Sequence, residues 1–442
     1  MSPSLFSRLE TALARVVTAE RKEIPALVAS FFYFFAVLTA YYIIRPVRDE
    51  MGLMLGANKL KDVFIIVFII MLLAIPLFGW IVSTFERRRV VPTIYGFFIL
   101  NLLGYWLFLR SGAQTPLIAN SFFVWAAVFN LFVISLFWSV MSSTWTSDQA
   151  KRLYGFISAG GTIGALTGPA IAQALATTIG RSNMLLVAAT FLILALAIAL
   201  YLQTYIAPSE PATAQKHEPA TIRSIFAGAL RVWESPYLFR VALWVFLANV
   251  ISTFFYFEQA NIVGAAIENR DLRVQFLARM DFAVSILTII IQVFLTARIM
   301  DKFGLGFSAA TLPFAAIIGF IALAISPTLW VIVAIIVIER AVTFSLASPA
   351  AKVLYTTLAP DDKYKAQNFI DTVVYRGGDA LSGTYFDILM KKFGLGFAGV
   401  AVVTIPLAGV WLGLSFVLER MFKERQAKEL QSHTQAAKTS EH

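Results

Sequence analysis

Long apolar segments recur along the whole chain and constrain its fold more than any other feature. About twelve of them reach the roughly 20 residues that cross the hydrocarbon core of a bilayer, beginning near Ile24, Asp62, Val91, Ser121, Leu153, Met184, Leu238, Leu272, Ser308, Leu329, Asn368 and Phe397. Within hydrocarbon, only a helix satisfies all the backbone N–H and C=O groups of a single segment. Hydrophobic residues make up 59% of the chain and charged residues 14%, and the mean hydropathy is +0.75. We therefore expect an all-α membrane protein with about twelve transmembrane helices.

A polar interruption divides these segments into two sets of equal size. It contains the string APSEPATAQ at residues 207–215, which is typical of a linker. The pattern predicts five parts: an amphipathic N-terminal helix at 1–23, a six-helix bundle at 24–204, a linker at 205–237, a second six-helix bundle at 238–419 and a tail at 420–442. Lys and Arg are roughly twice as frequent in the loops on one side as on the other, so the linker and both termini are expected to be cytoplasmic. A bacterial inner membrane fits this pattern best.

Cysteine and histidine usage excludes several kinds of chemistry. The chain has no cysteine, so it has neither disulfides nor thiolate catalysis, and its three histidines, His217, His433 and His442, lie in the linker or the tail. No nucleophile–base pair or metal-ligand cluster stands out, so we expect neither an enzyme nor a cofactor. The net charge of +10 comes from basic residues that flank the apolar segments, which indicates contact with membrane lipids and not with nucleic acid.

Ionisable residues inside apolar segments are costly and usually functional. The candidates for substrate binding or gating in the second half are Glu258, Arg279, Asp281, Glu339, Arg340, Asp371, Arg376 and Asp379. Arg376 and Asp379 stand three positions apart on one helix face, where they form either a purely structural pair or part of a site. Arg279 and Asp281 are placed better in an outer vestibule. Glu258 is either a solvated helix end or a carrier of a coupling proton.

Arg45, Arg48 and Asp49 close the first apolar segment. At 1.5 Å per residue the two arginines lie near the outer surface of the bilayer, where they either extend toward lipid headgroups or contact an anionic substrate or a gate.

Short internal matches indicate that the halves are repeats. GALTG at 164–168 parallels DALSG at 379–383, and KFGLGF occurs at both 302–307 and 392–397, where it opens the ninth and twelfth segments. The glycines between 155 and 168 are spaced for close helix packing and not as a phosphate-binding loop.

Two bundles of six helices, a long linker and a basic FERRR loop at 85–89 resemble the major facilitator superfamily. The resemblance implies a transporter that binds its substrate between the two halves near the bilayer midplane and exposes it alternately to either side.

Three stretches narrow the resemblance: YIIRPVRD at 42–49, FWSVMSSTWTSDQAKRLY at 137–154, and SLASPAAKVLY at 345–355 followed by KYKAQNFID at 363–371. They are similar to motifs of the ATP/ADP translocase family, the nucleotide triphosphate transporters of plastids and intracellular bacteria, and of its bacterial relatives. The similarity implies that Arg45, Asp49, Asp371 and Arg376 match family positions, and that Arg48 replaces a lysine.

Departures from the family pattern fall on polar positions. Ser143 stands where these translocases commonly carry Glu or Gln, Ala351-Lys352 replaces a Lys-Glu pair, Gln367 replaces a Lys, and Asp379 takes a position often held by Lys. Fewer cations weaken attraction for a polyphosphate.

We therefore expect a secondary active transporter, acting as a monomer, that moves an anionic or zwitterionic, nucleotide-like metabolite by exchange or with a coupling proton, but does not exchange ATP for ADP. The alternatives are an exporter of a lipid-like or amphipathic substrate, and a membrane scaffold or sensor that transports nothing. An aromatic-lined cavity that opens sideways to lipid would favour the exporter.

Overall fold

The computed structural model describes residues 20–112, 115–204, 222–358 and 360–440, and within these residues all regular elements are helices. The first half contains η1 (Arg21–Glu23), α2 (Ile24–Leu55), α3 (Ala57–Thr84), α4 (Arg87–Arg110), α5 (Pro116–Thr144), α6 (Ser147–Ile179) and α7 (Arg181–Gln203). The second half contains α8 (Ile222–Glu234), α9 (Pro236–Ala266), α10 (Arg270–Ile291), η2 (Gln292–Thr296), α11 (Ala297–Ile325), α12 (Leu329–Val342), η3 (Thr343–Ala347), α13 (Ser348–Leu354), α14 (Pro360–Phe369), η4 (Ile370–Val374), α15 (Tyr375–Asp387), η5 (Ile388–Lys392) and α16 (Phe397–Ser440).

The expected number of membrane crossings is confirmed by these helices. Nine helical stretches of the described chain are long and apolar enough to cross a bilayer. One of them, Arg270–Ile325, has 56 residues and is broken at Gly304, so it supplies two crossings of about 20 residues or more each. Helix α6 and the helical run at 360–392 have the necessary length but more polar or small residues, and they complete a set of about twelve.

Glycine ends the helices at both copies of the KFGLGF repeat. Gly304 has φ +84° and Gly394 has φ +64°, a left-handed conformation that side chains with a Cβ atom rarely adopt. The two glycines hold the same position in the repeated string. The repeat is therefore a turn that opens the ninth and twelfth membrane segments, as the sequence predicts.

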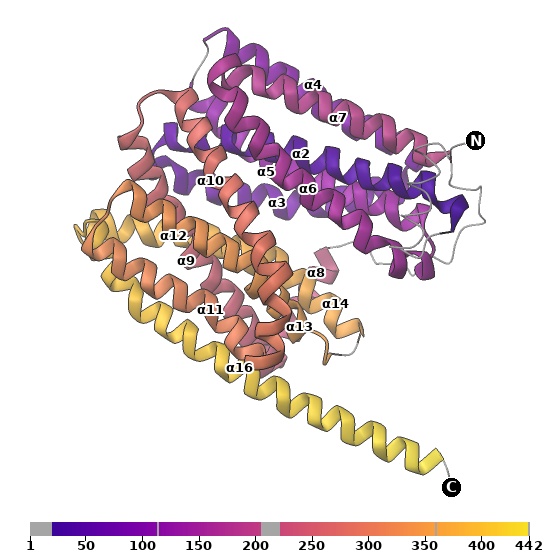
Figure 1. Cartoon of the computed structure of the whole chain (residues 1–442). Coiled ribbons are helices and arrows are strands. Elements are labelled where there is room, and N and C mark those ends of the chain that lie inside the picture. Colours follow the sequence, from indigo (N-terminus) through magenta and orange to yellow (C-terminus); the bar gives the residue numbers. More distant parts are fainter. Residues whose placement is uncertain (1–19, 113–114, 205–221, 359, 441–442) are drawn as a thin grey trace. The chain divides into compact units, whose positions relative to one another are not determined.

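The chain forms two compact units that do not simply follow the sequence. The first comprises Met1–Met54, Leu77–Pro219 and Glu268–Phe282, and the second comprises Leu55–Pro76, Ala220–Ile267 and Ala283–His442. In the first unit α4 and α7 lie side by side, and in the second α11 and α16 do so (Figure 1). Helices α3 and α10 each contribute one part to either unit.

A glycine stripe on α6 packs directly against the backbone of α2. A Cβ atom added to Gly160 would collide with the carbonyl oxygen of Phe31, and one added to Gly164 would collide with that of Phe35. Gly168 is equally confined by Tyr42. These positions recur every four residues on one helix face, so they let the two helices approach closely. The packing role expected for the glycines between 155 and 168 is thus confirmed for Gly160, Gly164 and Gly168 but not for Gly155, which has nothing within 4 Å of an added Cβ atom.

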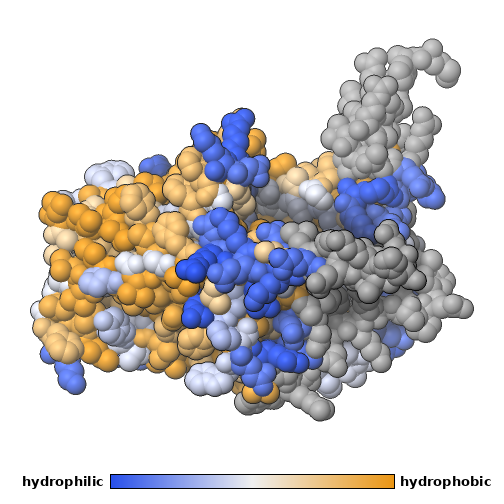
Figure 2. Space-filling model, turned by 90° about the horizontal axis from the view of Figure 1, so that it is seen from below, coloured by the Kyte–Doolittle hydropathy of each residue, from blue (hydrophilic) through white to orange (hydrophobic). Residues whose placement is uncertain are grey.

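Large apolar side chains cover much of the surface. Leu73, Leu100 and Trp330 are 64%, 69% and 73% exposed. Figure 2 shows apolar residues spread over a broad part of one face, with the hydrophilic residues gathered in another part. Such a surface is unfavourable in water and suits the hydrocarbon of a bilayer.

Several boundaries differ from the sequence-based expectation. Helix α9 continues to Ala266, beyond the helix end considered at Glu258, and α16 continues as one helix through most of the expected tail. The expected linker contains α8. Residues 1–19 and 205–221, which hold most of the expected N-terminal helix and half of the linker, lie outside the described residues.

Four short π-helical turns, η2 to η5, interrupt helices of the second unit. Two of them are joined by side chains, because Gln292 and Thr296 of η2 donate to the carbonyl oxygens of Phe344 and Ser345 in η3 at 3.3 and 2.8 Å. A π turn leaves carbonyl groups without their usual helical partners, and such turns are frequent at functional sites.

Candidate functional site

The first unit holds a cluster of charges where α2 meets α10. Arg45 Nε lies 3.7 Å from Asp281 Oδ2 and 3.9 Å from Asp49 Oδ2, and its guanidinium stands 5.7 Å from the ring centre of Tyr42. Both carboxylate side chains are about 3% exposed. The ion pair between residues from two helices shows that Arg45 is held inside the protein and does not extend toward lipid headgroups.

Arg48 belongs to the same cluster. Its Nη2 and Nε atoms donate to Asp49 Oδ1 at 2.5 and 2.9 Å, and its guanidinium lies 5.1 Å from the ring centre of Phe123 on α5. Asp49 is thus approached by two arginines from its own helix.

A neighbouring pair was missed by the sequence analysis. Arg270 donates from Nε and Nη2 to the two oxygens of Glu50 at 2.5 and 3.0 Å, and the Glu50 side chain is fully buried. Both residues stand at the ends of apolar segments, where a loop position is the ordinary expectation. Because the two residues are 220 positions apart, no local sequence pattern indicated that they are in contact.

Further polar contacts hold the first part of α10 in this unit. Asp271 accepts from the backbone N–H and the Nη1 of Arg181 at the start of α7, at 3.0 and 3.2 Å. Gln275 donates to the Gln173 carbonyl on α6 at 2.9 Å. Arg279, in contrast, is exposed, and the described residues give it no ion pair. The structure therefore separates Arg279 from Asp281, which the sequence analysis placed together.

The cluster is electrically balanced, which limits what it can bind. Three arginines, Arg45, Arg48 and Arg270, face three carboxylates, Asp49, Glu50 and Asp281. The cluster is therefore a set of ion pairs that joins α2 to the first part of α10.

The second unit holds a different polar cluster, centred on two neighbouring residues of α9. The Ser252 hydroxyl donates to Glu339 Oε1 on α12 at 2.5 Å, and the Thr253 hydroxyl donates to Asp379 Oδ1 on α15 at 3.1 Å. Glu339 and Asp379 are 6% and 9% exposed. Consecutive positions on a helix point about 100° apart, so α9 presents one hydroxyl to each neighbouring helix.

Arg376 completes this cluster. Its Nη1 lies 3.4 Å from Asp379 Oδ2, so the two residues form the pair that their spacing indicates, and the arginine side chain remains 27% exposed. Arg340 lies close enough to Glu339 to interact with it electrostatically. The cluster therefore combines both signs of charge within membrane-spanning helices.

Glu258 lies on the same helix, one and a half turns beyond Thr253. It is 4% exposed, and its Oε2 atom has no hydrogen-bond partner within the described residues. The expectation of a solvated helix end was wrong, because α9 continues to Ala266 and buries this carboxyl group.

Asp371 does not join the cluster. It stands in η4, is 43% exposed, and pairs with Lys352 Nζ at 2.5 Å. A second pair missed by the sequence analysis joins Lys61 of α3 to Asp387 of α15 at 2.6 Å, across 326 residues. Within the described part of the chain, His, Asp and Glu side chains form no group of three suited to a metal ion.

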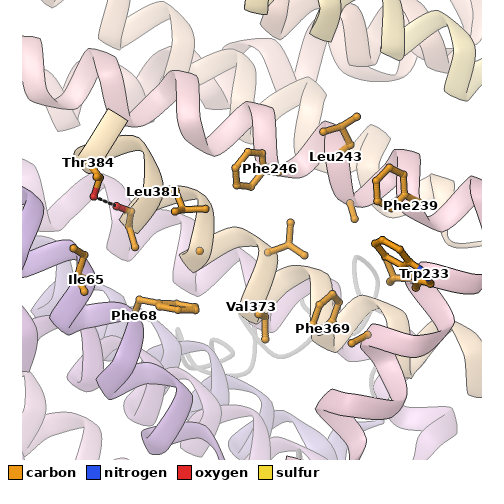
Figure 3. Close-up of a pocket in the computed structure, with 16 residues that line it drawn as sticks. Ile65, Phe68, Trp233, Phe239, Leu243, Phe246, Phe369, Val373, Leu381 and Thr384 are labelled. Atoms are coloured by element: carbon orange, nitrogen blue, oxygen red, sulfur yellow. Dashed lines mark hydrogen bonds between the residues drawn. The ribbon is translucent and has the colours of Figure 1, made fainter. Parts of the chain in front are cut away.

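The second unit also contains an apolar cavity of about 740 Å³ (Figure 3). Its lining comes from the first part of α3, from α8 and α9, and from the helical run that extends from the end of α14 through η4 into α15. Aromatic rings are prominent in it, namely Phe68, Trp233, Phe239, Phe246 and Phe369.

Comparisons with known proteins identify the fold. The model of the Major Facilitator Superfamily matches residues 26–383. The structure is similar to that of the nucleoside transporter NupG, with 12% sequence identity, a TM-score of 0.64, and coverage of 90% of this chain and 98% of that chain. It is also similar to a POT family transporter bound to a thioalcohol-conjugated peptide, with 12% identity, a TM-score of 0.62, and coverage of 91% and 96%. A third similar structure is that of a bacterial homologue of the human lysosomal transporter Spinster. Its sequence identity is 15% and its TM-score is 0.57, with coverage of 92% of this chain and 99% of that chain. No curated protein sequence matches the chain.

Proposed function

Because the chain belongs to the Major Facilitator Superfamily, we propose that it is a secondary active transporter that moves a small anionic or zwitterionic metabolite by alternating access. The observation that carries the proposal is the polar cluster of the second unit, in which Ser252 and Thr253 hold Glu339 and Asp379 inside membrane-spanning helices. Buried ionisable groups in such helices are expensive, and they usually mark the path of a substrate or ion.

The mixture of charges in this cluster favours a zwitterionic substrate over a polyphosphate. Arg376 offers a partly exposed cation for an acidic group, while Glu339 and Asp379 offer carboxylates for an amine. An ATP molecule carries several negative charges and would meet those carboxylates as well. We therefore expect the substrate to be a nucleotide-like or amino-acid-like metabolite, and we do not expect exchange of ATP for ADP.

Glu258 is the proposed carrier of a coupling proton. Its buried Oε2 atom has no hydrogen-bond partner within the described residues, and a carboxyl group can take up and release a proton as its surroundings change between conformations. Glu258→Gln should then abolish uptake driven by a proton gradient while leaving substrate exchange at equal pH intact. Loss of both activities would argue against a coupling role.

The substrate class is tested most efficiently by thermal-shift screening of the purified protein, followed by uptake into proteoliposomes. Nucleotides, amino acids, dipeptides and sugar phosphates form the panel, because a ligand that binds the folded state raises its melting temperature. We expect a zwitterionic or monoanionic compound to stabilise the protein, and the Arg376→Met variant to lose that shift. A shift that is larger for ATP than for every zwitterion would contradict the proposal.

The aromatic-lined cavity favours one alternative, an exporter of an amphipathic substrate. Uptake assays separate the two candidates, since an exporter of this kind would move a fluorescent lysolipid across the bilayer and would not accumulate polar metabolites.

The balance of basic residues supports cytoplasmic termini in an inner membrane. A cysteine introduced at Ser209 should therefore be labelled only from the cytoplasmic side.

A further inference from the structure

The apolar cavity of the second unit is elongated. Its lining follows one helical run from Phe369 at the end of α14 to Thr384 in α15, which corresponds to about 22 Å at 1.5 Å per residue. Figure 3 shows the side chains spread along this run, with Thr384 and Ile65 near one end and Trp233 and Phe369 near the other. The length exceeds the roughly 15 Å of hydrocarbon in one leaflet.

The chemistry of the lining excludes a polar ligand. Among the lining residues, the polar side-chain groups are the Thr384 hydroxyl, which donates to the Ala380 carbonyl at 3.5 Å, and the Trp233 indole N–H. Figure 3 places these two residues near opposite ends, so the middle of the cavity offers no polar side chain to orient a phosphate, an amine or a sugar. A ligand that gains from this lining must be apolar over its length.

The rim shows which medium the cavity faces. Trp233, Phe239 and Leu381 line the cavity and are also 78%, 46% and 59% exposed. Large apolar side chains at an opening to water are unfavourable, whereas in contact with hydrocarbon they cost nothing. The cavity therefore opens toward the bilayer.

The end near Trp233 is bordered by charges. On α8, Arg231 lies 3.1 Å from Asp362 of α14 and 3.8 Å from Glu234. Both signs of charge are partly exposed there, with Arg231 at 50% and Asp362 at 38%. A Trp residue beside charged groups at the end of membrane-spanning helices is typical of the membrane–water interface.

We propose that this cavity binds one acyl chain of a membrane phospholipid, whose headgroup lies beside the Arg231–Asp362 pair. An interfacial end with both charges, followed by a long apolar channel that opens to hydrocarbon, complements a zwitterionic headgroup and one tail. This binding goes beyond the proposed transport activity and does not depend on it, because it can be measured without any transport.

The test compares two Gly→Leu variants of the full-length protein. A Cβ atom at Gly377 would meet only Phe68, at 3.9 Å, so Gly377→Leu fills the cavity without a backbone collision. Gly409 on α16 has nothing within 4 Å, and Gly409→Leu is the matched control outside the cavity. Native mass spectrometry counts bound palmitoyl-oleoyl-phosphatidylethanolamine as its concentration is varied.

We expect saturable binding of one lipid to the wild-type protein and to Gly409→Leu, and at least tenfold weaker binding to Gly377→Leu. Equal binding by the two variants, or no saturable binding to the wild-type protein, would overturn the proposal.

A second measurement remains informative should Gly377→Leu not fold. The chain has no native cysteine, so Val373→Cys places one thiol in the cavity and Val402→Cys places one on the lipid-facing side of α16. The same phospholipid should slow maleimide labelling of Val373→Cys in detergent and leave Val402→Cys unaffected. Equal protection of both thiols, or of neither, would contradict acyl-chain binding in this cavity.

Discussion

At the scale of single residues, the charges of this chain differ in how completely they are matched. Arg376 illustrates a partial match, because Asp379 lies at one side of it and the guanidinium is still 27% exposed. Glu50 illustrates a full match, because it is entirely buried and receives two hydrogen bonds from Arg270. A partly exposed cation can exchange partners during transport, whereas a buried bidentate pair holds its helices together.

The first prediction concerns the pair on α15. Arg376→Met alone removes the cation that pairs with the buried Asp379, so we expect a lower melting temperature than for the double variant Arg376→Met/Asp379→Leu. The double variant should fold close to wild type and fail to transport. A matched control removes the exposed α16 pair with Arg420→Met/Glu424→Leu, which should alter neither property. An active double variant would remove Arg376 from the site.

The second prediction concerns the pair missed by the sequence analysis. Arg270→Met leaves Glu50 buried without its partner, which should destabilise the protein by about 3 kcal/mol or more. Arg279→Met, on the same helix but at an exposed position, serves as the control and should change stability little. Chemical or thermal denaturation in detergent measures both, and equal effects would show that the Glu50–Arg270 pair is not structural.

At the scale of helices, tight packing of glycine positions and polar contacts at helix starts hold the first unit together. Glu23 makes such polar contacts at helix starts. It accepts hydrogen bonds from Gln149 and Arg152 at 2.7 and 3.1 Å and so connects the start of α2 to the start of α6. The glycine stripe then keeps the same two helices in contact along their length.

The third prediction follows from that stripe. Gly164→Ala places a methyl group against the Phe35 carbonyl and should destabilise the protein by about 1–3 kcal/mol, the usual range for overpacking. Gly155→Ala, on the same helix, meets nothing within 4 Å and should be neutral or stabilise by about 0.5–1 kcal/mol. Melting temperatures that move in the same direction would contradict close packing of α6 on α2.

The fourth prediction uses the pH dependence of the Glu23 contacts. Burial raises the pKa of Glu23, but hydrogen bonds from the Glu20 N–H, Gln149 and Arg152 lower it by more, so the pKa lies below its ordinary value of 4.5. These contacts stabilise the fold fully above that ordinary value and are lost as the pH falls through the lowered pKa. Glu23→Gln should therefore lose less stability than wild type between pH 7 and pH 3. Glu424→Gln, at an exposed pair, should follow wild type.

At the scale of the whole molecule, the sequence predicted the class and count of helices because each crossing carries its own signal. The recurring KFGLGF turns and the glycine stripe were recognisable for the same reason, since both depend on neighbouring residues. Long-range ion pairs were not recognisable from the sequence. Lys61 and Asp387 are 326 residues apart, and nothing local distinguishes either residue from an ordinary helix end. The apolar cavity was equally hidden, since its lining residues resemble any lipid-facing side chains.

Alternating access requires that the polar cluster around Ser252 is reached in turn from the two sides of the membrane. A single cysteine at Ser252 in this cysteine-free chain tests it directly, because the side chain is partly exposed and borders Glu339. A membrane-impermeant thiosulfonate is applied to proteoliposomes from outside or is enclosed within them. We expect labelling from either side, and a transported substrate should slow it. Labelling from one side only, or from neither, would contradict alternating access and would favour a scaffold or sensor.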